Sequence, residues 1–287
     1  MSSVSRIVTA LAATSIAALT IFAASCSSAP AAQEIVLKAI SATQGVTSLK
    51  TAIGLSATTE TTGGKQPGTT DMTISGSGIV DVSGKKSSLA LEMTVNPPGE
   101  APQTLSTNIF VVGDWEYVNS AQSPGWRKIK LSAGTTRPDS QLQQQGLLLR
   151  TASTAVSAGQ EKIDGIQCYV LTLTPDVNAL WQWFLYQGGA AGLKQPQLGS
   201  LDLTKAAKDV RLKVWVDTGK FLVRKVQVSM TVEFGLADIS APSSNFTSAS
   251  FVLSGDISLI DYNIPVDIRL PPDALNATDI TGKTTGP

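Results

Sequence analysis

The chain has 287 residues, 22 Lys+Arg against 22 Asp+Glu, 15% charged residues and no histidine. This length allows one large all-β domain or two ordinary domains. The balanced charge lacks the basic footprint of a nucleic-acid-binding protein. The missing histidine excludes Ser-His-Asp and Cys-His catalysis and His-ligated zinc. Chemistry by carboxylates, Lys, Ser or Tyr remains open, as does a protein without any chemistry.

The N-terminus is typical of an export signal. Residues 1–25 carry a single charge, Arg6, followed by an apolar run and three small residues before Cys26. Small residues directly before a cysteine resemble a bacterial lipobox, in which the Cys sulfur takes a diacylglyceryl group and becomes the new N-terminus. The alternative is an ordinary signal peptide with an incidental cysteine.

Membrane attachment is expected to rest on acylated Cys26. Removal of residues 1–25 takes away Arg6 alone, so the side-chain charge becomes 21 − 22 = −1. A near-neutral body has no basic patch for anionic lipid, whereas two or more acyl chains anchor a protein stably. The second cysteine, Cys168, is expected to be a small buried apolar residue.

Residues 26–46 are predicted to form the lipidated tether and an N-terminal helix that begins at Gln33 and ends near Gly45. Beyond them the apolar residues alternate with polar ones, which predicts half-buried antiparallel strands. Leu89, Leu91 and Met93 share one face in the clearest of these strands. The strands expected in this half are 51–62, 71–82, 87–95, 105–112, 114–118 and 126–131, with a hairpin turn at 83–86.

The middle of the chain interrupts this pattern. Residues 139–159 show no alternation and predict an amphipathic helix. A strand is expected at 163–174, an aromatic-rich helix at 177–187 and a short third helix at 201–208. The last strands are expected at 210–217, 222–234 and 251–259, before a flexible C-terminal tail at 275–287.

These elements predict an α+β fold with one domain at 47–274: a strongly curved antiparallel sheet, a half-barrel, with helices covering its concave face. A sheet of this size tends to curl, and a few helices over a long apolar face would leave a hydrophobic cavity. Ordinary core packing explains the same alternation. The candidate cavity residues are Ile74, Leu89, Leu91, Met93, Leu147, Leu148, Trp181, Phe184, Val226, Val228, Met230, Phe251 and Leu253.

The sequence contains no convincing catalytic, cofactor or metal motif. Gly76-Ser-Gly78 begins a dinucleotide fingerprint, but Asp81 stands at the third glycine position and a strand pattern follows. Asp and Glu residues lie beside glycines or at strand ends, where turn roles explain them. We therefore expect no catalytic residue, no cofactor and no metal.

Several short segments carry a family resemblance. They are Gly113-Asp-Trp-Glu-Tyr117, Gly125-Trp-Arg-Lys128, Gly159-Gln-Glu-Lys-Ile-Asp-Gly165 with Tyr169-Val-Leu-Thr172, Val214-Trp-Val-Asp217 with Gly219, and Asp261-Tyr-Asn-Ile-Pro-Val266 with Pro271. In order and spacing, from about Thr47 to Ala274, they resemble the mycobacterial LppX/LprG lipoproteins, which share a half-barrel fold with LolA, LolB and RseB.

The resemblance implies a U-shaped sheet closed by helices around a cavity for the acyl chains of lipids or glycolipids. It implies export, anchoring on the outer face of the cell membrane of an actinobacterium, and a transporter partner in the inner membrane. It carries over no catalytic residue, and Cys26 is the one functional residue that transfers directly. The leading hypothesis is thus a membrane-anchored lipid carrier. A non-carrier sensor or scaffold on the same fold and a hydrolase on a β scaffold are the alternatives.

Overall fold

The computed structural model describes residues 29–63, 67–121, 123–131, 149–150, 152–178, 180, 203–235 and 247–281. The chain divides into two compact units, Met1–Ala31 and Ala32–Pro287. The second unit contains all of the described secondary structure, and the description below concerns this unit alone.

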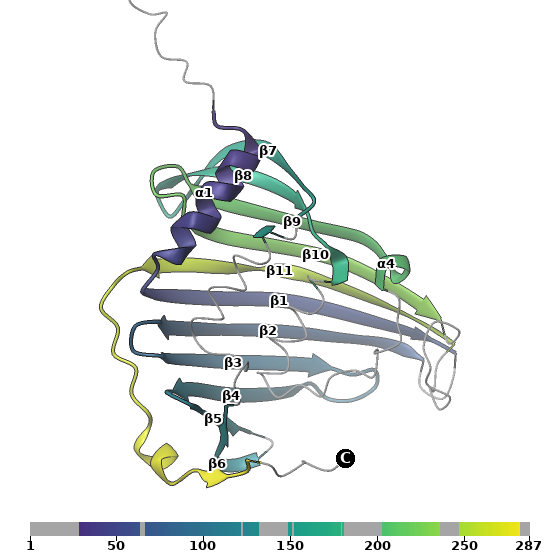
Figure 1. The fold of residues 1–287 in the computed structure, drawn as a ribbon. Coiled ribbons are helices and arrows are strands. Elements are labelled where there is room, and N and C mark those ends of the chain that lie inside the picture. Colours follow the sequence, from purple (N-terminus) through teal and green to yellow (C-terminus); the bar gives the residue numbers. More distant parts are fainter. Residues whose placement is uncertain are drawn as a thin grey trace, which may run out of the picture. The chain divides into compact units, whose positions relative to one another are not determined.

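One sheet of 12 strands forms the body of this unit, in the order β12-β6-β5-β4-β3-β2-β1-β11-β10-β9-β8-β7 (Figure 1). All pairs are antiparallel except β12, which runs parallel to β6. The sheet is open, with β7 and β12 as its two edges. The strands are β1 Ser48–Thr62, β2 Gly68–Asp81, β3 Lys86–Asn96, β4 Gln103–Val112, β5 Trp115–Ser120, β6 Ser123–Lys130, β7 Thr154–Ile163, β8 Ile166–Thr174, β9 Ala207–Asp217, β10 Val223–Gly235, β11 Ser248–Tyr262 and β12 Thr278–Asp279.

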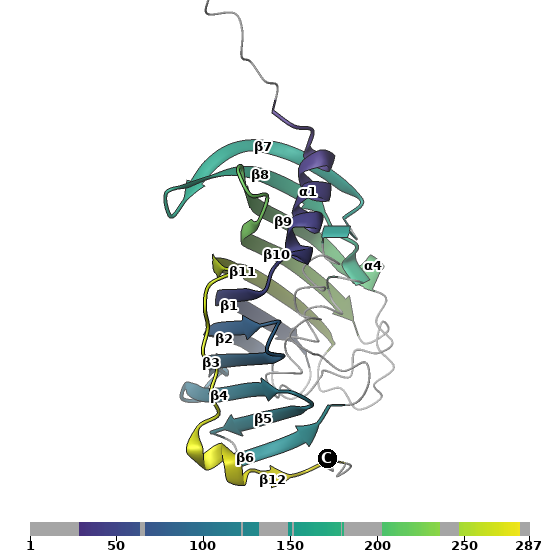
Figure 2. The ribbon, with the colours of Figure 1, turned by 60° about the vertical axis from the view of Figure 1, so that its left-hand side comes forward.

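Helix α1, Ala32–Gln44, lies across one face of the sheet near its β7 end (Figure 2). Its residues Ile35, Val36 and Ala39 are buried in the main apolar cluster, together with side chains of β8, β9 and β10. The helix ends before Gly45, as its sequence predicts. Two further short helical segments are α4, Leu203–Ala206, and the 3-10 helix η2, Pro272–Asn276. Residues 149–150, residues 177–178 and Leu180 are helical as well.

Strand register sorts the side chains onto two faces. We call the face that carries α1 the helix-side face. Across its centre, Met230 lies opposite Leu253, and Leu253 lies opposite Ala57. The two larger apolar clusters lie on this face. The other face is mainly polar, with small clusters around Trp126 at one end and around Trp215 and Cys168 at the other.

The structure confirms most predicted strands and corrects the middle of the chain. Residues 154–159, predicted as the end of a helix, belong to the edge strand β7, which pairs with β8 through a turn at Asp164 and Gly165. Two residues take up that turn and a bulge interrupts β7 at Gly159, where φ is +101°. Because β7 is an exposed edge strand, it lacks the apolar alternation of a half-buried strand.

Two further differences concern shorter segments. The third helix is confined to Leu203–Ala206, because Ala207 and Lys208 already belong to β9. Part of the predicted flexible tail is ordered: η2 packs Ala274 against Trp126, and Thr278 and Asp279 form β12. Both predicted mid-chain helices are seen in part, because residues 149–150, residues 177–178 and Leu180 are helical, and Leu149 and Leu180 are buried in the main apolar cluster. Most of the remaining residues of these helices lie outside the described ranges.

Candidate functional site

The structure brings the described cavity candidates onto one face. On β2 and β3, Ile74 lies opposite Met93, while Leu89 and Leu91 lie opposite glycines of β2. On β10 and β11 the candidates continue on the same helix-side face. The nine described candidates on it are Ile74, Leu89, Leu91, Met93, Val226, Val228, Met230, Phe251 and Leu253.

These candidates fall into two groups that differ in packing. Val228, Met230 and Leu253 are 4%, 1% and 2% exposed and belong to the packed core. Val226 and Phe251 pack at the margins of the same clusters. The three buried side chains therefore hold the sheet together and leave little surface for a ligand, whereas Val226 and Phe251 are half-buried.

The second group is a half-buried apolar surface on β2 and β3. Its members are Ile74, Leu89, Leu91 and Met93. None of the four belongs to an apolar cluster made by the described residues. We call these four residues the β2–β3 patch, and this patch is the part of the predicted site that keeps apolar surface for a ligand.

Gly76 lets Leu91 of the patch lie close against β2. A Cβ at Gly76 would stand 2.6 Å from Leu91 Cδ2 and 2.5 Å from the Ala90 carbonyl oxygen. Real Cβ atoms do not approach other atoms this closely, so a larger residue at position 76 would force the Leu91 side chain and the β3 backbone at Ala90 to shift. The sequence fragment read as a broken nucleotide fingerprint thus has a packing role.

Two charged residues lie next to the apolar positions of the same face, on the hairpin of β5 and β6. Glu116 lies opposite Val111 and Ile129, and Arg127 lies opposite Val118. Sequence reasoning missed both residues as site candidates. The signal was present, because each alternates with an apolar residue in a short strand, so a charge falls where the pattern calls for an apolar side chain.

Glu116 sits in a water-poor environment. Burial raises the pKa of its carboxyl group above the usual range, because loss of hydration disfavours the ionised form. No hydrogen bond or ion pair joins the Glu116 carboxyl group to another side chain in the part of the chain that the structure describes.

A pocket of about 540 Å³ lies elsewhere, at the rim of the sheet near the ends of β7, β10 and β11. Its lining mixes charged groups such as Lys220 and Asp261 with apolar ones such as Ile163 and Leu222. None of the predicted cavity residues lines this pocket. It is therefore distinct from the apolar cavity that the sequence predicts.

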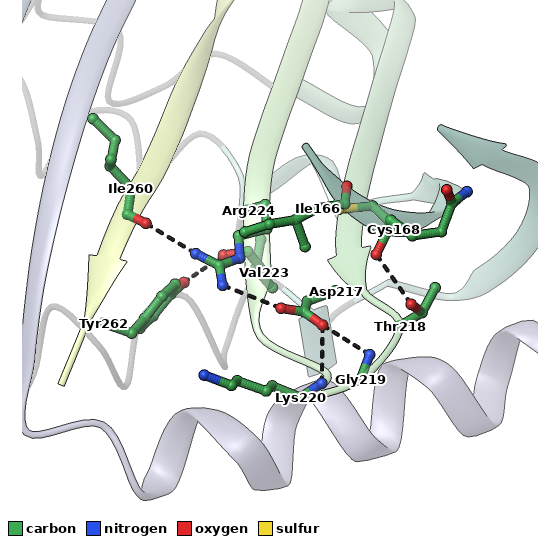
Figure 3. A network of polar contacts seen from close by, with 11 residues as sticks. Ile166, Cys168, Asp217, Thr218, Gly219, Lys220, Val223, Arg224, Ile260 and Tyr262 are labelled. Carbon is green, nitrogen blue, oxygen red and sulfur yellow. Dashed lines mark hydrogen bonds and ion pairs between the residues drawn. The ribbon is translucent and has the colours of Figure 1, made fainter. Parts of the chain in front are cut away.

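A polar network braces the rim beside this pocket (Figure 3). The Asp217 carboxylate accepts hydrogen bonds from the backbone N–H groups of Gly219 and Lys220 at 2.8 and 2.9 Å, and forms an ion pair with Arg224 at 3.1 Å. Arg224 also donates to the Ile260 carbonyl oxygen. Because these partners occupy both carboxylate oxygens of Asp217, we interpret the network as one that stabilises the β9–β10 turn.

The pKa values in this network follow from burial and hydrogen bonding. Burial alone would raise the pKa of Asp217, but the backbone donors and the Arg224 guanidinium outweigh it and hold the pKa below the usual range. Burial raises the pKa of the Tyr262 hydroxyl, which donates a hydrogen bond to the Val223 carbonyl oxygen. Both groups thus keep their ordinary charge at neutral pH.

The remaining predicted site residues lie outside the described residues: Cys26, Leu147, Leu148, Trp181 and Phe184. Within the described ranges, no cluster of acidic or cysteine side chains has the arrangement of a metal site. The same ranges contain no helix with the length and apolar character needed to cross a bilayer.

Comparison with known proteins gives structural likeness alone. No family model matches the sequence, and no curated protein matches it. Among solved structures, the chain is similar to LprF from Mycobacterium bovis, at 14% identity and a TM-score of 0.48, over 84% of this chain and 96% of that one. It is similar to the lipoprotein LppX of Mycobacterium tuberculosis at 18% identity and a TM-score of 0.39, over 82% and 97%.

A LolA superfamily protein from Nitrosomonas europaea is similar at 14% identity and a TM-score of 0.23, over 83% of this chain and 96% of that one. At these identities and scores, no argument about function rests on the likeness. The structural neighbours LprF and LppX are mycobacterial lipoproteins of the LppX/LprG family, the group that the sequence resembles.

Proposed function

We propose that this protein is an envelope lipoprotein that binds the acyl chains of a lipid or glycolipid on its helix-side face and helps to transfer them across the cell envelope. The observation that carries the proposal is the β2–β3 patch. Its four apolar side chains stay half-buried beside a packed core, and none joins a cluster of the described residues. Apolar surface of this kind marks a binding site in a soluble domain.

Physical chemistry favours an acyl chain as the occupant. Burial of apolar area contributes about 25 cal/mol per Å², and association costs offset part of that gain. A long, flexible hydrocarbon chain matches a flat row of Leu, Ile and Met side chains without any specific hydrogen bond. We infer no catalytic role for this face, where lipid binding requires only burial.

Export and anchoring belong to the same proposal. A lipidated Cys26 would hold the body at the outer face of the cell membrane, where it could receive lipid from a transporter in the inner membrane. Two or more acyl chains on Cys26 would make that attachment stable.

The test combines lipid analysis with one matched pair of variants. We expect native mass spectrometry of gently purified protein, followed by lipid extraction, to show bound lipid. Leu91→Asp should lower the amount bound by about tenfold or more, because a carboxylate would enter the apolar face. Ala90→Asp is the control, since Ala90 is exposed on the opposite face of the same strand.

Two outcomes would contradict the proposal. One is a lipid-free protein with a fully packed interior. The other is equal lipid binding by a folded Leu91→Asp variant and its control, with folding checked by circular dichroism. A lipid-free protein with a stable partner in crosslinking would instead support the sensor or scaffold alternative.

A further inference from the structure

The helix-side face is nearly free of charge. In strands β1 to β6 and β11, the register places apolar, small or neutral polar residues at every position of this face except two. The exceptions are Glu116 and Arg127, on neighbouring strands of one hairpin. Two opposite charges, placed together on this otherwise uncharged part of the face, point to a polar group that is recognised there.

The two charges do not neutralise each other. Glu116 lies opposite Ile129 and Arg127 lies opposite Val118, so the two are diagonal neighbours across the hairpin. Diagonal neighbours have Cα atoms about 7–8 Å apart, within reach of long side chains. Even so, no ion pair joins them, and neither has a polar partner within the described ranges.

On the opposite face of the sheet, charged side chains form ion pairs. There Lys213 pairs with Glu161 at 3.2 Å, and Lys225 pairs with Asp256 at 3.4 Å. Those pairs lie at the water-exposed surface. On the helix-side face, where burial disfavours an ionised Glu116, an unpaired carboxyl is costly to keep. A ligand that carries a complementary charge would remove that cost.

We propose that Glu116 and Arg127 together bind the headgroup of a zwitterionic glycerophospholipid that carries a primary ammonium, while its acyl chains lie on the β2–β3 patch. This inference rests on the proposed function and names the class of lipid. The Arg127 guanidinium matches the geometry of a phosphate and forms charge-assisted hydrogen bonds with it. The Glu116 carboxylate accepts hydrogen bonds from the ammonium, which has three N–H donors.

Three lipids with identical acyl chains distinguish the contact of Arg127 with the phosphate from the contact of Glu116 with the ammonium. Phosphatidylethanolamine offers both charges, phosphatidylglycerol offers only the phosphate, and diacylglycerol offers neither. The full chain, purified in a mild detergent, is mixed with micelles that contain equal amounts of the three dioleoyl lipids. The protein is then recovered, and its extracted lipids are counted by mass spectrometry.

We expect the unaltered protein to retain phosphatidylethanolamine over phosphatidylglycerol by about tenfold, the difference of one charge-assisted contact. Glu116→Gln should abolish that preference. Arg127→Gln should lower retention of both phospholipids relative to diacylglycerol. Offered alone in separate micelles, diacylglycerol should be retained equally by both variants and the unaltered protein, which also shows that each variant has folded.

The controls place the same changes on the other face. Glu92→Gln lies on β3 and Lys130→Gln lies on β6, both exposed and both turned away from Glu116. Equal retention of the three lipids by the unaltered protein, or the same change in Glu92→Gln as in Glu116→Gln, would overturn the headgroup site and leave the proposed function standing. Failure to retain any of the three lipids would contradict the proposed function itself.

Discussion

At the scale of single residues, Asp217 and Arg224 form the least exposed ion pair between described residues. Its side chains are only 9% and 12% exposed. Asp217→Asn would keep an acceptor for the Gly219 and Lys220 N–H groups and would leave the Arg224 guanidinium buried without its counter-ion. Breaking a buried pair in this way costs about 3–5 kcal/mol, so we expect that loss in the free energy of unfolding at pH 7, measured by urea denaturation.

This loss should depend on pH in one direction. The folded pKa of Asp217 is lowered, so its stabilising effect is complete above the unfolded pKa, about 3.9, and disappears as the pH falls through the folded value. The difference in the free energy of unfolding between the unaltered protein and Asp217→Asn should therefore become smaller as the pH falls. Asp267→Asn is the control, because the Asp267–Arg269 pair is largely exposed, and its unfolding midpoint should not change. A stability difference between the unaltered protein and Asp217→Asn that grows at acidic pH would contradict the lowered pKa of Asp217.

Residue roles were predictable from the sequence only where a pattern repeats. The alternation of Leu89, Leu91 and Met93 predicted their shared face, and the register confirms it. The same alternation did not distinguish the packed Met230 from the half-buried Met93, because packing depends on which element lies above each strand. Glu116 was missed because a turn role was assigned to the carboxylates near Gly113, whereas the structure places Glu116 within β5.

At the scale of elements, helix α1 packs against one end of the helix-side face and stabilises it. Ile35 is fully buried in the main cluster, whereas Leu37 is 59% exposed on the same helix. Ile35→Ala removes buried methyl groups and leaves a cavity, which costs about 2–5 kcal/mol. Leu37→Ala should stay within about 0.5 kcal/mol of the original stability. Urea denaturation checks both, with an unchanged slope showing that the transition is comparable. Equal losses in the two variants would show that α1 does not pack as described.

Elements with a clear local signal were predicted correctly. Gly45 predicted the end of α1, and the residues 83–86 predicted the hairpin between β2 and β3. Residues 154–159 of edge strand β7 were predicted as helix because both faces of that strand are mostly exposed. Its apolar residues are therefore few, and only its pairing with β8 defines it as a strand. Such pairing is a long-range property that no short window of sequence contains.

At the scale of the whole chain, two cysteines with opposite expected roles allow a sharp test of anchoring. Cys26 follows the predicted export signal, whereas Cys168 is a free cysteine, fully buried beside Val170 and Trp215. Burial raises the pKa of the Cys168 thiol, which makes this cysteine a poor nucleophile at neutral pH. Its place in the cluster is that of a small apolar residue, as the sequence predicts.

We therefore expect Cys26→Ala to release the protein from the membrane fraction and Cys168→Ala to leave it there. With the signal removed, the side-chain charge is 21 − 22 = −1, so charge gives the body no hold on an anionic bilayer and a salt wash should not detach the unaltered protein. Fractionation of cells, with mass spectrometry of the N-terminal peptide for its acyl groups, makes the measurement. Membrane retention of Cys26→Ala after a salt wash would show that some other part of the chain holds the protein at the membrane. A lipid on Cys26 would then not be needed for the attachment.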